Sequence, residues 1–165
     1  MEIQSVVKLT NDREARLKGR MAAYKLALDN SLTKEQLTQY VSEGNFQNTS
    51  EYMSLSPDLL ASYIEGFKEG IVTILADMDD ESCELSDHLR SRKYTYATDG
   101  ALIAIEFARS NSFDINSIKS ELEDNEQDLE EFLQTGKPHR YSPGSSVRYA
   151  KDGYIHELKH LLNFF

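Results

Sequence analysis

The chain has 165 residues, of which 39% are hydrophobic and 28% are charged, a balance that predicts one folded domain over residues 1–165 and excludes wholesale disorder. The formal net charge of -10 at pH 7 argues against a protein that mainly grips nucleic-acid phosphates. No apolar run is long enough for a membrane span, the start Met1-Glu2-Ile3-Gln4 does not resemble a signal peptide, and Cys83 is the single cysteine. We therefore expect a soluble protein of the reducing cytoplasm.

The first nine residues alternate loosely, with Ile3, Val7 and Leu9 on one side. This pattern predicts a short N-terminal strand. A helix is then expected from Asn11, which is suited to cap it, because Glu14 stands at the third helical position of a capping box.

The next two helices have clear start signals. Thr33 and Gln36 form a second capping-box pattern, and Gly44 predicts the end of that helix. Ser56-Pro57-Asp58 combines a cap, a proline at the first helical position and an early acid. A buried helix is expected from Leu59 to Met78.

Three further helices are predicted toward the carboxyl end. Apolar residues at helical spacing favour helices over about 98–110 and 116–134, and a last helix over about 146–163 follows a loop at 135–146. The chain as a whole is predicted to be all-α, a single-domain bundle of about six helices.

A short internal similarity recurs in these helices. Tyr96 to Gly100 resembles Tyr149 to Gly153, and Tyr63 to Gly66 repeats it more faintly. Because a glycine inside a helix costs about 1 kcal/mol relative to alanine, we interpret these glycines as points where two helices cross closely.

Acidic residues gather in two segments. Like charges at helical spacing repel one another, so these segments are either solvated surface or the contact surface for a basic partner. The longer segment has seven acids within eleven residues: Glu121, Glu123, Asp124, Glu126, Asp128, Glu130 and Glu131. The second acidic segment lies near the middle of the chain and consists of Asp77, Asp79, Asp80 and Glu81.

The segment His156-Glu157-Leu158-Lys159-His160 has the H-E-x-x-H form of zinc peptidases. In such a site the two imidazoles hold zinc and the glutamate activates a bound water. The apolar arc of this helix, however, places both histidines on nearly the opposite side, and the usual downstream third ligand is missing. A zinc-dependent hydrolase that uses these residues is kept as an alternative.

The predicted first helix is locally basic, although the chain is acidic. A nucleic-acid-binding regulator that uses this helix is the second alternative, and the overall charge favours pairing of these bases with acids of the same chain. The bases are Lys8, Arg13, Arg16, Lys18, Arg20 and Lys25.

The composition and motifs together predict a noncatalytic interaction protein of the inhibitor or immunity type, of bacterial or phage origin. Its expected partner is a protein with a basic, nucleic-acid-binding surface, whose groove the acids would occupy in place of phosphates. No cofactor, membrane contact or direct nucleic-acid contact is expected, and homo-oligomerisation is left open.

Overall fold

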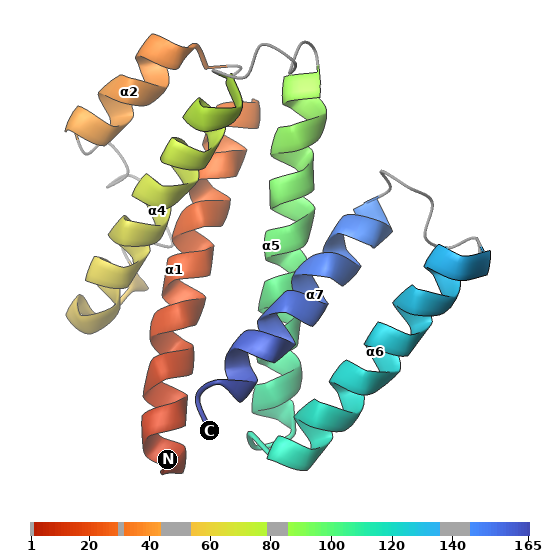
Figure 1. Ribbon diagram of the computed structural model, residues 1–165. Coiled ribbons are helices and arrows are strands. Elements are labelled where there is room, and N and C mark those ends of the chain that lie inside the picture. Colours follow the sequence, from red (N-terminus) through yellow and green to blue (C-terminus); the bar gives the residue numbers. More distant parts are fainter. Residues whose placement is uncertain (1, 30–31, 44–53, 79–85, 136–145) are drawn as a thin grey trace. The chain divides into compact units, whose positions relative to one another are not determined.

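The computed structural model describes residues 2–29, 32–43, 54–78, 86–135 and 146–165. These residues form helices and no strand, which confirms the predicted all-α bundle of six helices (Figure 1). None of the helices in these ranges is long and apolar enough to cross a membrane. The helices are α1 (Ile3–Asp29), α2 (Lys34–Glu43), α4 (Pro57–Met78), α5 (Ser86–Ser110), α6 (Ile115–Thr135) and α7 (Ser146–Leu162).

The predicted N-terminal strand is wrong, because α1 already begins at Ile3. Val6 and Thr10 are fully buried, and the Thr10 hydroxyl donates to the Val6 carbonyl oxygen at 2.7 Å, four residues back. Ile3 and Leu9, which defined the alternation, are exposed. The four-residue spacing of the buried positions is that of a helix, and the start predicted at Asn11 is wrong for the same reason.

Other helix starts are confirmed at the level of hydrogen bonds. The Thr33 N–H donates to Gln36 Oε1 at 2.9 Å, and the Gln36 N–H donates to the Thr33 hydroxyl oxygen at 3.2 Å. This is the reciprocal capping box that the sequence predicts. Pro57 opens α4, where the N–H groups of Leu59 and Leu60 donate to the Ser56 carbonyl oxygen.

The chain forms two compact units, one of residues 11–95 and the other of residues 1–10 and 96–165. Helices α1 and α5 each contribute to both units, so the units are not successive lengths of chain. The domain bounds 1–165 stay a prediction. The predicted loop at 135–146 lies outside the described residues except at its ends, where α6 stops and α7 begins.

Each unit has its own buried apolar residues. In the unit of residues 11–95 they come from α1, α2 and α4, and one cluster of them consists of Ala23, Tyr24, Leu37, Phe67, Ile71 and Ile74. In the other unit they come from the first residues of α1, the carboxyl half of α5, α6 and α7, and include Val6, Ala104, Ile105, Ala108, Ile118, Ile155, Leu158 and Leu161.

Glycines allow one pair of helices in each unit to meet at backbone contact. A Cβ on Gly100 of α5 would overlap the Ala150 carbonyl oxygen of α7, and a Cβ on Gly153 would overlap that of Ala97. Gly19 of α1 and Gly66 of α4 face each other's helices in the same reciprocal way, against Tyr63 and Arg16. This confirms the interpretation of Gly66, Gly100 and Gly153 as close crossing points, and Gly19 joins them as the partner of Gly66.

Candidate functional site

Helix α6 carries the longer acidic segment, and its start is fixed by local interactions. Ser112 and Phe113 have left-handed φ values of 54° and 56°, which turn the chain after α5, and Phe113 is buried. Asp114 then caps α6 by accepting the Ser117 N–H at 3.0 Å and the Ser117 hydroxyl at 2.7 Å. These bonds to the charged form lower the pKa of Asp114.

The seven acids of α6 divide between two sides of the helix. Glu121 and Asp128 are half-buried and face α7. The remaining five are exposed: Glu123, Asp124, Glu126, Glu130 and Glu131.

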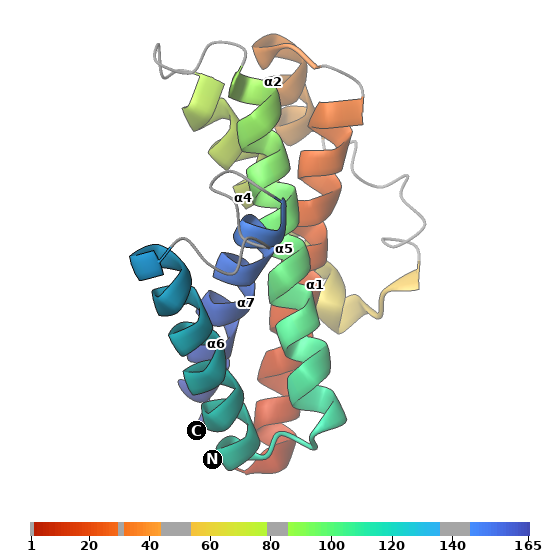
Figure 2. The same cartoon turned by 90° about the vertical axis from the view of Figure 1, so that its right-hand side faces the viewer.

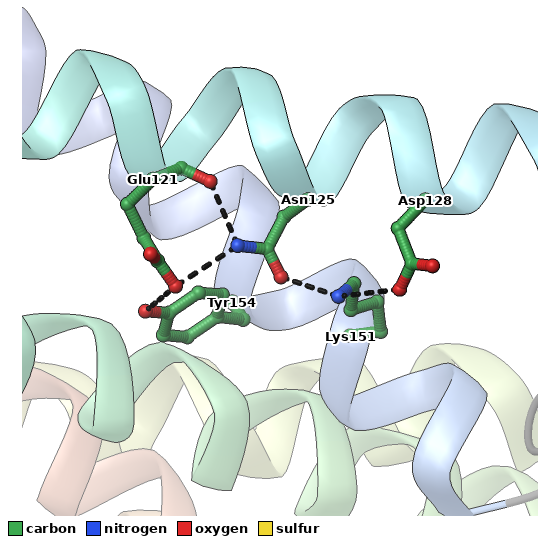
Figure 3. A network of polar contacts seen from close by, with 5 residues as sticks. All are labelled: Glu121, Asn125, Asp128, Lys151 and Tyr154. Carbon is green, nitrogen blue, oxygen red and sulfur yellow. Dashed lines mark hydrogen bonds and ion pairs between the residues drawn. The ribbon is translucent and has the colours of Figure 1, made fainter.

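The inward side of α6 makes a polar network with α7 (Figure 3). The Tyr154 hydroxyl donates to Glu121 Oε1 at 2.9 Å, and Asn125 Nδ2 donates to the same oxygen at 3.0 Å. Lys151 Nζ donates to Asn125 Oδ1 and lies 3.3 Å from Asp128 Oδ2. Two residues of α7, three apart, are thus held by three residues of α6.

This network is shielded from solvent. The side chains of Lys151 and Asp128 are only 14% and 21% exposed, so their attraction is screened less than that of a surface pair. Burial, together with the nearby Glu121 carboxylate, raises the pKa of the Tyr154 hydroxyl. The network therefore holds Tyr154 neutral and Lys151 beside a carboxylate.

The outward side of α6 bears acids, amides, one exposed leucine and one exposed base, Lys119, which stands four residues before Glu123. Glu123, Gln127 and Glu130 follow one another at intervals of four and three residues, so they share a face. Glu130 accepts a hydrogen bond from Gln134 at 3.2 Å on the same helix. Leu133, near the end of this helix, is 64% exposed.

Glu126 stands beside this face and forms an ion pair with Lys159 of α7 at 3.7 Å. Both side chains are about half exposed, so the pair contributes little to stability.

Of the second acidic segment, Asp77 alone belongs to the described residues. It closes α4 as a half-buried side chain and accepts a hydrogen bond from the Tyr94 hydroxyl at 3.3 Å. Tyr94 also stacks on Tyr24, with ring centroids 5.5 Å apart. Asp79, Asp80 and Glu81 lie outside the described residues.

The three residues of the H-E-x-x-H segment have different surroundings. His156 is exposed, Glu157 is 0% exposed, and His160 packs edge-on against Phe164 with ring centroids 5.3 Å apart. Among the side chains that the structure describes, no three of His, Cys, Asp or Glu come together as a metal site.

The burial of Glu157 could have been predicted from its helical spacing, but the H-E-x-x-H motif drew attention to a catalytic role instead. Glu157 is three residues after Tyr154 and four before Leu161, so it belongs to the same helical arc as these packed residues.

Several bases of α1 are paired within their unit. Arg20 Nε donates to Glu69 Oε2 of α4 at 2.8 Å, and Arg16 lies 3.5 Å from Glu69 Oε1. Lys18 is 3.9 Å from Glu14 on the same helix. These contacts confirm the expected internal pairing for Arg16, Lys18 and Arg20, whereas Lys8 and Lys25 are exposed.

No family model, curated protein or solved structure is found to match this chain.

Proposed function

We propose that the protein is a noncatalytic cytoplasmic interaction protein of the inhibitor or immunity type, and that the outward side of α6 binds a basic surface of another protein. The observation that carries the proposal is the division of the acids on α6. Glu121 and Asp128 are half-buried against α7, whereas the other five acids are exposed, although one of them, Glu126, pairs with Lys159 of α7.

The outward acids are not placed where they would stabilise the helix. Acids stabilise the first turn of a helix and bases the last, because of the helix dipole, yet α6 has no acid in its first turn and no base in its last. Glu130 and Glu131 stand near the carboxyl end, where the dipole disfavours negative charge. Glu126 also repels Glu123 and Glu130 at three- and four-residue spacing. A cationic partner would relieve this repulsion.

The net charge of -10 supports the same partner class. A field of one sign speeds the encounter with an oppositely charged surface. Surfaces that bind nucleic acid are rich in Lys and Arg, and a row of carboxylates can occupy them in place of phosphates. No observation in the described residues favours the zinc-hydrolase alternative or the nucleic-acid-binding alternative over this one.

The test is capture of proteins from a host-cell lysate at physiological salt, quantified by mass spectrometry, with wild type and two variants. Glu123→Lys/Glu126→Lys/Glu130→Lys reverses three outward acids of α6. Glu35→Lys/Glu65→Lys/Asp99→Lys makes the same charge change at exposed positions of α2, α4 and α5.

We expect wild type and the control variant to retain the same basic proteins and the α6 variant to lose them. Equal retention by both variants would remove α6 from the interaction. Retention of no protein by wild type would overturn the proposed function itself.

A further inference from the structure

Helix α6 contains the same three-residue pattern twice. In each case an acid is followed four residues later by an amide and seven residues later by another acid. The second copy begins two residues after the first, which rotates it by about 200° around the helix. The inner triad, Glu121, Asn125 and Asp128, faces α7, and the outer triad is Glu123, Gln127 and Glu130.

The inner triad shows what this pattern binds. Its first acid accepts the Tyr154 hydroxyl, while its amide oxygen and second acid share the Lys151 ammonium group (Figure 3). The side-chain N–H group of Asn125 also donates a hydrogen bond to the Glu121 carboxylate. Because Glu121 meets Tyr154 and Asp128 meets Lys151, the two helices run antiparallel at this contact. The bound element is thus a helix with lysine and, three residues later, tyrosine.

The outer triad offers the same chemical groups to the outside. Its three side chains are exposed. In the described part of the chain, no hydrogen bond or ion pair engages Glu123 or Gln127. Gln127 and Glu130 are each one methylene longer than Asn125 and Asp128, so they reach a helix that lies farther away. Leu133, one turn beyond Glu130 and 64% exposed, adds an apolar contact beside the acids.

We propose that the outer triad binds a partner helix that presents lysine and, three residues later, tyrosine, in an antiparallel orientation to α6. This inference rests on the proposed function and names the element of the basic partner that α6 recognises. Lysine lies against Gln127 and Glu130, the tyrosine hydroxyl donates to Glu123, and the apolar stem of the lysine packs near Leu133.

The probe is a synthetic alanine-based helical peptide of about 20 residues, long enough to be helical in water, with lysine and tyrosine three apart. A second peptide carries glutamine in place of lysine. Binding is measured from amide chemical shifts of the isotope-labelled full chain in low salt, because exposed ion pairs are weakened by screening.

We expect saturable shifts along residues 123–133 with the lysine peptide. Glu123→Gln/Glu130→Gln should weaken its binding roughly threefold to tenfold, as expected for two exposed charged contacts. The control Asp124→Asn/Asp99→Asn removes two charges outside the triad and should change binding less than about twofold. All substituted residues are exposed, and thermal melts verify that both variants remain folded.

Equal binding of the two peptides, or unchanged binding by Glu123→Gln/Glu130→Gln, would overturn the inference. So would shifts centred on Lys151 and Tyr154, because the peptide would then be displacing α7. If the lysine peptide does not bind while lysate capture still depends on α6, this inference fails and the proposed function stands. If neither depends on α6, both fail.

Discussion

At the scale of single residues, four glycines decide how closely helices meet. Gly100 and Gly153 each face the backbone oxygen of an alanine three residues before the other glycine, and Gly19 and Gly66 repeat this arrangement in the other unit. Backbone atoms at such a contact cannot yield as the end of a long side chain can. The crossings therefore tolerate no side chain at these four positions.

Gly100→Ala should lower the free energy of unfolding by about 2 kcal/mol or more, since the overlap outweighs the gain in helix propensity. Chemical denaturation measures the change. Ser120→Ala, at an exposed position of α6, should alter stability by less than about 0.5 kcal/mol. A Gly100→Ala protein as stable as this control would contradict the crossing.

Glu157 is another residue whose role depends on its surroundings. It is fully buried on α7, whereas its neighbour His156 is exposed. A buried polar side chain carries a desolvation penalty that only its contacts offset. If Glu157 is a packed structural residue, its replacement should lower stability and that of His156 should not. If the two residues belong to a zinc site, replacing either should weaken zinc binding.

Glu157→Ala should destabilise the protein by about 1–3 kcal/mol, because the group that interacts with the buried Glu157 side chain loses its partner. His156→Ala should change stability by less than about 0.5 kcal/mol. Thermal melts with and without added zinc complete the test, since a bound metal raises the melting temperature. If Glu157 is a packed structural residue, zinc has no effect; a rise that His156→Ala abolishes would restore the metal site.

At the scale of elements, α6 is attached to α7 by polar as well as apolar contacts. The two helices lie side by side in both views (Figure 1, Figure 2). Ile118 of α6 and Leu158 of α7 are fully buried, and the polar network joins Tyr154 to Glu121 and Lys151 to Asp128. This network engages two of the acids of α6, Glu121 and Asp128, with α7.

Alkaline pH should weaken this attachment. The pKa of Tyr154 is raised above its ordinary value of 10.0, so between pH 10.0 and the folded pKa the native protein binds more protons than the unfolded chain. Stability contributed by Tyr154 is complete below pH 10.0 and is lost as the pH rises through the folded pKa.

The free energy of unfolding, measured from about pH 8 to about pH 11, should therefore fall, and less steeply in Tyr154→Phe. Some decline should remain in this variant, because burial also raises the pKa of Tyr24. An identical decline in both proteins would show that Tyr154 is not coupled to folding.

At the scale of the whole molecule, the net charge of -10 opposes folding by self-repulsion. Five of the seven acids of α6 are exposed, and Lys119 is the one base of this helix. Negative charge therefore outweighs positive charge on the exposed part of α6.

Salt should stabilise the protein for this reason. Raising NaCl from about 10 mM to about 300 mM shortens the screening length from roughly 30 Å to under 10 Å. We expect the melting temperature to rise by about 2–4 °C, the equivalent of about 1 kcal/mol. Glu123→Gln/Glu130→Gln should show a smaller rise. A fall with salt would mean that ion pairs such as Lys151 with Asp128 outweigh the repulsion.

Local features of the chain were predictable where neighbouring residues decide them. The capping box of Thr33 and Gln36, the start at Pro57 and the helical class depend on contacts within one turn, so the sequence alone determines them. The same kind of reasoning failed at Ile3 to Leu9, because a loose alternation there was outweighed by the burial of Val6 and Thr10.

The sequence by itself also determined that acids concentrate between Glu121 and Glu131. Only the tertiary structure decided that Glu121 and Asp128 serve α7 and that Glu123 and Glu130 face outward. Apolar residues at helical spacing, among them Ile118, Leu122 and Leu129, already mark the side of α6 that packs, but they do not say which acids beside it are engaged. Lys151 and Tyr154 decide this, and these residues lie more than twenty positions away in the chain.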